Sequence, residues 1–291
     1  MEKSGLFLIY KEENMTSREV DNYLKKKFNV NKIGHFGTLD PFAEGLLIVG
    51  INKGTTLFNY LNENNKEYIG KIKLGIATST LDKEGEIIDR KDVPNLSKEE
   101  VINVLKSFLG EQEQLIPKYS ATKINGKEFY KLAREDEDKV PEVYKKINVY
   151  SIDLISFEDN EILFSCSVSK GTYIRQLAYD ISKKLNTVGY LENLMRTKVA
   201  NYSLKDAKKL SEIKEEDLLT FKNVAFKMFP VVMVTDNQYN WVIHGGRFNS
   251  KTNQNHFILL VDCYQKIIGI YENVHNNVYR CKEGLYNFDL N

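Results

Sequence analysis

Hydrophobic and polar positions follow strand-like patterns in several separate stretches of the chain. Two stretches are continuously apolar and indicate short buried strands, and the others place apolar residues at every second position. Tyr68 falls near the start of one alternating stretch, on its apolar face. The predicted strands cover residues 5–10, 45–51, 67–76, 147–156 and 161–169.

Segments with helical spacing separate these strands. Thr16 and Ser97 are each followed three positions later by a glutamate, the capping-box sequence that begins a helix, and Gly110 is expected to end the second helix. Apolar residues at helical spacing predict a third helix over 174–185. Because the mixture shows no regular βαβ alternation, it predicts an α/β (α+β) fold with a mixed, largely antiparallel central sheet.

The pattern changes toward the C-terminus. Residues 205–222 are charged and helical in character, which favours a helical linker. The apolar runs 257–262 and 267–272 flank a short Cys-Tyr-Gln-Lys turn and predict a hairpin. We therefore expect a large domain over residues 1–227 and a small all-β module over residues 228–291.

The chain has 291 residues, with 41 Lys and Arg against 40 Asp and Glu, for a formal net charge of +1. The charge is unevenly distributed. Residues 170–209 hold nine basic and three acidic residues, whereas residues 82–113 hold nine acidic and five basic ones. The near-neutral average therefore excludes a uniformly basic protein, but it is compatible with nucleic-acid binding at a basic cleft.

Several classes of protein are disfavoured by what the sequence lacks. No apolar run approaches the roughly 18 residues of a membrane-spanning helix, and the N-terminus lacks the apolar region of a signal peptide, so we expect a cytoplasmic protein without a membrane partner. The three cysteines and four histidines show no metal-ligand spacing, so we expect no metal and no disulfide framework. Residues 50–56 lack the residue order of a P-loop, and no dinucleotide fingerprint is present, so we expect no nucleotide cofactor.

The densest candidate for chemistry is the segment 34–47, Gly-His-Phe-Gly-Thr-Leu-Asp-Pro-Phe-Ala-Glu-Gly-Leu-Leu. It is a glycine-containing loop between a helix and a buried strand. Asp40 precedes Pro41, which keeps its backbone out of helical angles and places a short carboxylate on a rigid turn. A ligand can approach such a carboxylate closely, but Asp-Pro is also a common turn dipeptide. The local sequence alone favours the turn.

This segment resembles the catalytic motif of the TruB family of tRNA pseudouridine synthases, and three further segments match that family in order. Lys66-Glu67-Tyr68, with residues 74–85 after it, resembles the second motif. Residues 117–134 resemble the family's RNA-gripping insertion. Residues 169–175, Ser-Lys-Gly-Thr-Tyr-Ile-Arg, resemble the segment that supplies an active-site arginine. Four ordered matches over most of residues 5–200 reverse the interpretation of Asp40 in favour of catalysis.

The resemblance implies three catalytic residues. Asp40 would be the catalytic carboxylate, Arg175 would keep it ionised, and Tyr68 would stack on the flipped uracil. Isomerising uridine breaks the bond between uracil and sugar, turns the uracil and rejoins it through C5. The carboxylate can attack the sugar or remove a sugar proton, and the sequence leaves both routes open.

The resemblance also implies RNA contacts from the insertion, about residues 112–142, and from segments beside the active site. Interleaved basic and aromatic residues in the insertion suit phosphate contacts and base stacking. The predicted substrate-binding residues are His35, Lys118, Tyr119, Lys123, Arg134, Lys170 and Leu194.

The implied activity is conversion of uridine 55 in the T loop of tRNA to pseudouridine, by base flipping and without a cofactor. Nothing in the sequence demands more than a monomer, and the C-terminal module weakly resembles a PUA-type RNA-binding domain. One alternative is a non-catalytic tRNA-binding or tRNA-folding protein that retains the fold. A carboxylate-based glycosidase is less consistent, because it needs two placed carboxylates and Glu44 is the only other one in segment 34–47.

Overall fold

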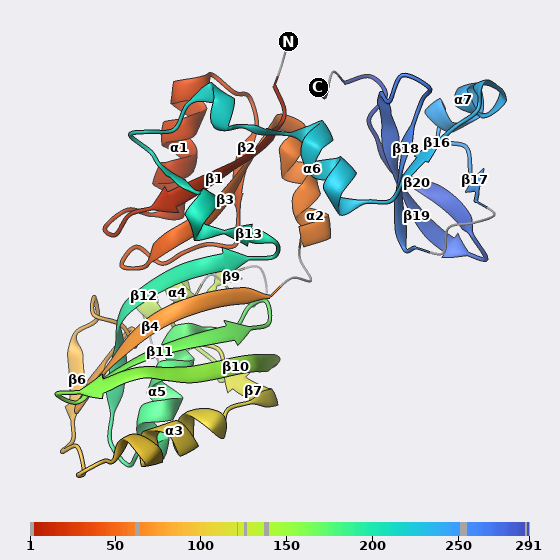
Figure 1. Ribbon diagram of the computed structural model, residues 1–291. Helices are drawn as coiled ribbons and strands as arrows, with labels where there is room; N and C mark the ends of the chain where they lie inside the picture. The colour runs from red at the N-terminus through yellow and green to blue at the C-terminus, as the bar shows by residue number, and fades with distance from the viewer. Residues whose placement is uncertain are drawn as a thin grey trace.

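A mixed sheet of 11 strands forms the body of the protein (Figure 1). The computed structural model describes residues 3–61, 65–120, 122–124, 127–136, 140–250, 255–288 and 290. Its main path runs β14-β1-β3-β12-β4-β11-β10-β7. The strands of this sheet are β1 (Gly5–Lys11), β2 (Ile33–Phe36), β3 (Glu44–Ile51), β4 (Lys66–Leu74), β7 (Gly110–Leu115), β10 (Tyr144–Glu158), β11 (Glu161–Val168), β12 (Gly189–Val199), β13 (Tyr202–Ser203), β14 (Lys208–Lys209) and β15 (Leu219–Thr220).

Most neighbouring strands of this sheet run antiparallel, and only the pairs β1/β14 and β3/β12 are parallel. The predicted mixed, largely antiparallel sheet is therefore confirmed. The long hairpin β10–β11 turns at Asp159 and Asn160, which both have positive φ angles that their short polar side chains tolerate. Two small hairpins lie outside the sheet: β5 (Ile76–Thr78) with β6 (Ile87–Arg90), and β8 (Lys123–Ile124) with β9 (Lys127–Glu128).

Two helices begin where capping residues predict them. The helical segments are α1 (Ser17–Phe28), η1 (Asn52–Leu57), α2 (Phe58–Leu61), α3 (Lys98–Lys106), α4 (Phe129–Glu135), α5 (Ile174–Lys184), η3 (Leu204–Asp206), η4 (Glu215–Asp217), α6 (Phe221–Met228) and α7 (Asp236–Ile243). Thr16 and Ser97 each form a complete capping box. The expected end of α3 at Gly110 is wrong. The helix stops at Lys106, and Gly110 begins β7 with φ +93°.

The expected helical linker over residues 205–222 is also wrong. This segment contains only the short turns η3 and η4 and the two-residue strands β14 and β15, before α6 begins at Phe221. Both strands pair with β1, one in parallel and one antiparallel. Its backbone groups therefore complete the hydrogen bonding of a sheet edge, which outweighs the helical preference of its lysines and glutamates.

A second sheet of five strands follows α6 and lies to the right in Figure 1. Its strands are β16 (Val231–Met233), β17 (Phe248–Asn249), β18 (Phe257–Val261), β19 (Ile267–His275) and β20 (Val278–Gly284). The predicted hairpin is β18–β19. The prediction of an all-β module is wrong, because α7 lies in this part of the chain, where Thr235 and Gln238 form a capping box.

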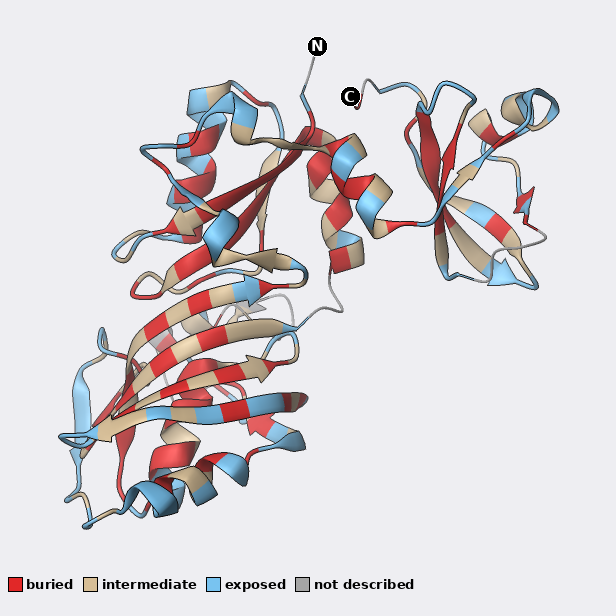
Figure 2. Ribbon diagram, in the orientation of Figure 1, coloured by how far each residue is buried: buried red, intermediate tan, exposed pale blue. Residues whose placement is uncertain are grey.

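Two apolar clusters lie on the main sheet, and one of them continues into the second sheet. The first packs α1, α3 and α5 against the sheet, and the alternation of buried positions along the strands is visible in Figure 2. The other joins residues of β1 and β3 with α6 and with Leu259 and Ile270 of the second sheet. Tyr60, Phe229 and Phe257 pack edge to face at this junction. The two sheets therefore share buried surface, while the domain boundary at residue 228 stays a prediction.

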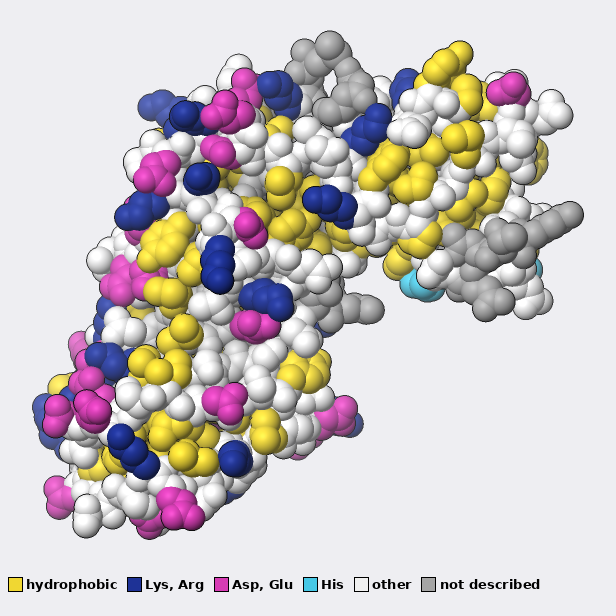
Figure 3. Space-filling model, in the orientation of Figure 1, with side chains coloured by type: hydrophobic (Ala, Val, Ile, Leu, Met, Phe, Trp, Pro, Cys, Tyr) yellow, Lys and Arg dark blue, Asp and Glu magenta, His cyan; other side chains and the backbone are white. Residues whose placement is uncertain are grey.

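The surface shows no single dominant charge on the face drawn in Figure 3, where basic and acidic side chains are interspersed. Lys71 and Lys73 of β4, for example, pair with Glu161 on the neighbouring strand at 3.2 and 2.7 Å. Within the described residues, every helix is too short or too polar to cross a membrane.

We expect Gly45→Ala to destabilise the protein by about 3 kcal/mol or more, since overpacking and backbone strain both act there. Gly45 has φ +109°, and a Cβ atom would lie 2.7 Å from the Arg196 backbone nitrogen across the parallel β3/β12 pair. Gly34→Ala is the matched control, because the nearest atom to its added Cβ is 3.9 Å away. Urea unfolding of both variants measures the difference. Equal midpoints would contradict the expectation.

Candidate active site

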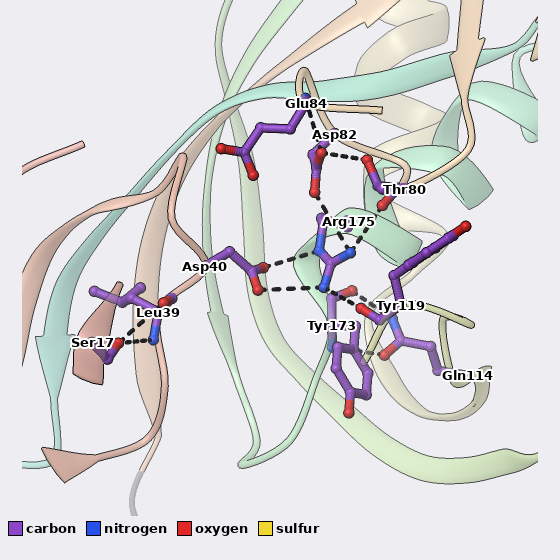
Figure 4. Close-up of polar contacts among 10 residues, drawn as sticks. All are labelled: Ser17, Leu39, Asp40, Thr80, Asp82, Glu84, Gln114, Tyr119, Tyr173 and Arg175. Carbon is purple, nitrogen blue, oxygen red and sulfur yellow. Dashed lines mark hydrogen bonds and ion pairs between the residues drawn. The ribbon is translucent and has the colours of Figure 1, made fainter. Parts of the chain in front are cut away.

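The loop between β2 and β3 carries Asp40 in a fixed backbone position. The Ser17 hydroxyl, at the start of α1, accepts a hydrogen bond from the Leu39 amide at 2.9 Å and donates to the Leu39 carbonyl at 3.0 Å (Figure 4). The Asp40 carbonyl accepts from the Ala43 amide at 3.1 Å. The residues on both sides of the carboxylate are thus held by hydrogen bonds, which limits the movement of Asp40.

Lys11 is buried beneath this loop and stabilises it. Its ammonium group donates to the carbonyls of Glu12, Met15 and Pro41 at 3.0, 2.7 and 3.2 Å. Burial lowers the pKa of Lys11 to about 8, and the nearby Asp40 carboxylate opposes that shift. Lys11 is therefore a structural cation whose donors are already occupied by backbone oxygens.

Arg175, in the first turn of α5, joins three segments at the carboxylate. Its Nε donates to Asp40 Oδ2 at 2.9 Å and its Nη2 to Asp40 Oδ1 at 3.4 Å, a two-point contact that fixes the plane of the carboxylate. Its Nη1 donates to the carbonyl of Thr80 at 2.9 Å, and its Nη2 also donates to the carbonyl of Tyr119 at 3.0 Å. Because Arg175 is almost fully buried and Asp40 is 37% exposed, the carboxylate is held on one side and open on the other.

The start of α5 is itself anchored. Gln114 of β7 accepts from the Tyr173 amide at 2.8 Å and donates to the Tyr173 carbonyl at 3.0 Å. Gln114 is buried, so this pair of bonds ties the first turn of α5 to the strand that leads into the predicted insertion. The same amide side chain therefore limits the positions that Arg175 can take.

A second carboxylate, that of Asp82, lies on a different side of the Arg175 guanidinium from Asp40. Its Oδ2 lies 3.5 Å from Arg175 Nη1, and its Oδ1 accepts from the Glu84 amide and the Thr80 hydroxyl. Burial raises the pKa of Asp82, while the hydrogen bond from Thr80 and the charge of Arg175 oppose the rise. Arg175 thus lies between a buried carboxylate and an open one, as Figure 4 shows.

A cavity of about 500 Å³ opens in front of Asp40. Tyr68 of β4 and Leu194 of β12 line it together with Tyr119, Tyr173 and the Asp40–Arg175 pair. Its volume falls in the usual range for a ligand pocket. Its mixture of aromatic walls with the Asp40–Arg175 pair and the Lys66 ammonium group suits a planar polar ligand. Burial raises the pKa of Tyr68, and the neighbouring Arg196 guanidinium opposes the shift. Tyr68 is therefore a neutral phenol at physiological pH.

The structure brings five of the predicted site residues to this cavity: Asp40, Tyr68, Tyr119, Arg175 and Leu194. His35, Lys118 and Lys170 are not among the residues that line it. His35 instead contacts Asp21 at 2.8 Å and Thr38 at 3.2 Å, which places it at the base of the Asp40 loop.

Two predicted residues cannot be placed against the cavity. The backbones of Lys123 and Arg134 lie in β8 and α4, but both side chains are outside what the structure describes.

The sequence reasoning assigned no role to several residues that build the site. Asp82 lies in a motif that the resemblance already included, and Lys66 belongs to the same Lys66-Glu67-Tyr68 match. The roles of Ser17 and Gln114 could not be predicted from the sequence, because their hydrogen-bond partners are backbone groups far away in the chain. Among the described residues, no group of three His, Cys, Asp or Glu side chains is placed to hold a metal ion.

Comparisons with known proteins agree on one family. The model for the N-terminal domain of TruB family pseudouridylate synthases matches residues 25–174. A tRNA pseudouridine synthase B of Mesoplasma florum is 37% identical over 98% of this chain and 99% of its own length. The corresponding protein of Mycoplasma mycoides is 33% identical over the full length of both chains.

Solved structures share the fold. A chain of a Cbf5–Nop10–Gar1 complex covers 94% of this protein and 79% of its own length, with a TM-score of 0.67 and 22% identity. A chain of an archaeal box H/ACA Nop10–Cbf5 complex covers 97% of this protein and 86% of its own length, with a TM-score of 0.68 and 18% identity.

The family match and the curated relatives together define an enzyme that isomerises uridine in RNA, a pseudouridine synthase. Within that class, the chain belongs to the TruB family.

Proposed function

We propose that the protein converts uridine 55 in the T loop of tRNA to pseudouridine, with Asp40 as the catalytic carboxylate and without a cofactor. The observation that carries this proposal is the Asp40 carboxylate, fixed by Arg175 at 2.9 Å and open to a cavity lined by Tyr68 and Leu194. The relatives named for activity on tRNA span nearly the whole chain, which supports tRNA as the substrate.

The cavity in front of Asp40 supports a reaction in which the target base leaves the RNA stack. Asp40 and Tyr68 line the same pocket, and a flipped nucleotide would place its base against the aromatic walls of this pocket. The carboxylate then acts on the sugar, either by attack at C1′ or by removing a proton. Arg175 serves both routes because it keeps Asp40 ionised and oriented.

The insertion over about residues 112–142 is the proposed grip on the RNA, with Lys118, Lys123 and Arg134 as phosphate contacts and Tyr119 as a stacking surface. Lys170 and His35 would add contacts around the T loop. The sheet after residue 228 would act as a PUA-like RNA-binding module. A cytoplasmic monomer without a membrane partner or nucleotide cofactor is the simplest form consistent with these proposals.

The experiment that tests this proposed function measures tritium release from unmodified tRNA transcripts labelled at C5 of uridine. We expect one equivalent of tritium per tRNA, release from an isolated T-arm hairpin, and no release when the T-loop uridine is replaced by cytidine. Release from the cytidine variant equal to that from the native transcript would refute the proposed position. Tight tRNA binding without any release from either transcript would favour the non-catalytic alternative.

A further inference from the structure

Two cationic side chains lie close to Gly37 in the wall of the cavity: Lys66 lines the cavity, and Arg196 is buried behind it. A Cβ atom built on Gly37 would lie 2.7 Å from Lys66 Nζ and 3.5 Å from Arg196 Nη1, so both groups point at the same place beside the Asp40 loop. Lys66 and Tyr68 occupy alternate positions of β4 and line the cavity together. Arg196 lies opposite Tyr68 on β12.

Neither of these cations is neutralised within the part of the chain that the structure describes. Lys66 Nζ makes no hydrogen bond or ion pair with a described residue and lies 5.5 Å from the centre of the Phe36 ring. Arg196 is fully buried, and its Nε and Nη2 donate to the carbonyls of Leu46 and Gly37. Its guanidinium interacts with the Tyr68 side chain, but its Nη1 makes no hydrogen bond of normal geometry with a described residue.

Lys66 and Arg196 differ from the other cations near the site in their hydrogen-bond partners. Lys11 and Arg175 both have several oxygen partners at hydrogen-bonding distance. Leaving a buried donor without a partner is costly, and this cost applies to Arg196 Nη1. Lys66 is half-buried and faces the cavity without an ion-pair partner among the described residues. Proteins keep such an unpaired group where a bound ligand supplies the missing hydrogen-bond acceptor.

The chemistry of the reaction supplies an acceptor in this cavity. When the C1′–N1 bond breaks, both bonding electrons stay with the uracil, whose negative charge is spread over N1, O2 and O4. The charge persists until C5 bonds to C1′, after which C5 loses its proton and N1 gains one, so that the product is an isomer of the substrate. A positive group that faces the base stabilises this stage more than the neutral starting nucleotide.

We propose that Lys66 binds the negative charge that develops on the detached uracil, and that Arg196 positions Lys66 and Tyr68 around it. Lys66 is then a catalytic residue, because its ammonium group touches the base. Arg196 is a positioning residue, because it acts through its neighbours. This proposal rests on the base occupying the cavity in front of Asp40.

The electrostatic setting of Lys66 supports this role. Burial lowers its pKa to about 8, with smaller contributions from Arg196 on β12 and Lys145 on β10, which are the charged groups that face it. Because the pKa is lowered, Lys66 carries its charge below about pH 8 and loses it as the pH rises through that value. We therefore expect the chemical rate to fall on the alkaline side of pH 8.

The test compares Lys66→Met and Lys66→Arg with the wild type in single-turnover tritium release at saturating enzyme, together with tRNA Kd at several salt concentrations. Lys73→Met is the control, because Lys73 lies on the opposite face of the same strand and pairs with Glu161 at 2.7 Å. Thermal unfolding of each variant checks the fold. The wild type is measured in the same assay. No tritium release by the wild type would contradict the proposed function, whereas release by the wild type allows the variants to test the role of Lys66.

We expect Lys66→Met to lower the single-turnover rate about 10²-fold, the usual effect of losing one charge-stabilising donor, with Kd changed less than about threefold. Lys66→Arg should keep part of the rate and lose the alkaline fall near pH 8. A weaker Kd with a salt slope reduced by about one, at an unchanged rate, would overturn the proposal, because it would assign Lys66 to a phosphate. Unchanged rate and unchanged Kd would also overturn it.

Discussion

Replacing Asp40 by asparagine should reduce pseudouridine formation by about 10⁴-fold or more while leaving tRNA bound. Asparagine preserves the size of the side chain and can still accept one hydrogen bond from Arg175. It cannot attack the sugar or remove a proton from it, because it carries no basic or nucleophilic oxygen. Tritium release measures the loss of chemistry, and filter binding measures the retained affinity for tRNA.

Glu44→Gln is the matched control for Asp40→Asn. Glu44 is the other carboxylate of segment 34–47, but it accepts a hydrogen bond from the Tyr10 hydroxyl and does not line the cavity. We expect this variant to keep a rate within about threefold of the wild type, as for substitutions outside the reacting groups. Comparable loss in both variants would indicate a two-carboxylate mechanism and contradict the assignment of Asp40 alone.

Replacing Arg175 should have the second largest effect, because it damages both catalysis and stability. Arg175→Lys keeps a positive charge but cannot contact both oxygens of Asp40 and the carbonyls of Thr80 and Tyr119 at once. We expect the rate to fall about 10²–10³-fold, since the carboxylate loses its fixed orientation. Single-turnover kinetics at saturating enzyme measure this loss.

Arg175→Met separates the structural contribution from the catalytic one. Without the guanidinium, buried Asp82 keeps no cation opposite its carboxylate, so we expect a loss of about 3–5 kcal/mol in the free energy of unfolding. Combining Arg175→Met with Asp82→Asn should recover part of the free energy of unfolding but none of the catalytic activity. Urea unfolding measures the free energy of unfolding, and tritium release measures the activity. Recovery of activity in the double variant would show that Arg175 serves only to neutralise Asp82.

The central sheet and its helices could be predicted from the sequence because their signals are local. The alternation around Tyr68 and the capping boxes at Thr16 and Ser97 depend on residues a few positions apart. The prediction of a helical linker over residues 205–222 was wrong for the opposite reason. Their strands exist only because β1 supplies hydrogen-bond partners about 200 positions away, and two-residue strands carry no periodicity.

The site shows the same division between local and distant signals. Asp40 and Arg175 were found through motifs 135 positions apart, and their pairing was expected from the family resemblance, because the residues of the motifs alone do not indicate a contact. Ser17 and Gln114 position the site through backbone atoms of distant residues, and such contacts leave no pattern in the residue types. Arg196 is similar, because an arginine in an alternating strand is ordinarily an exposed side chain.

The apolar cluster that joins the two sheets holds the second sheet against β1, β3 and α6. Since Leu259 and Ile270 are buried in the same cluster as β1 and β3, the second sheet has a set separation from the Asp40 loop. An RNA that touched both would have to match that separation, so the rigid junction would select substrates by the length between the target uridine and the second point of contact. Discrimination of this kind needs no base-specific hydrogen bond, and it would be lost if the aromatic contact of Tyr60 with Phe257 were loosened.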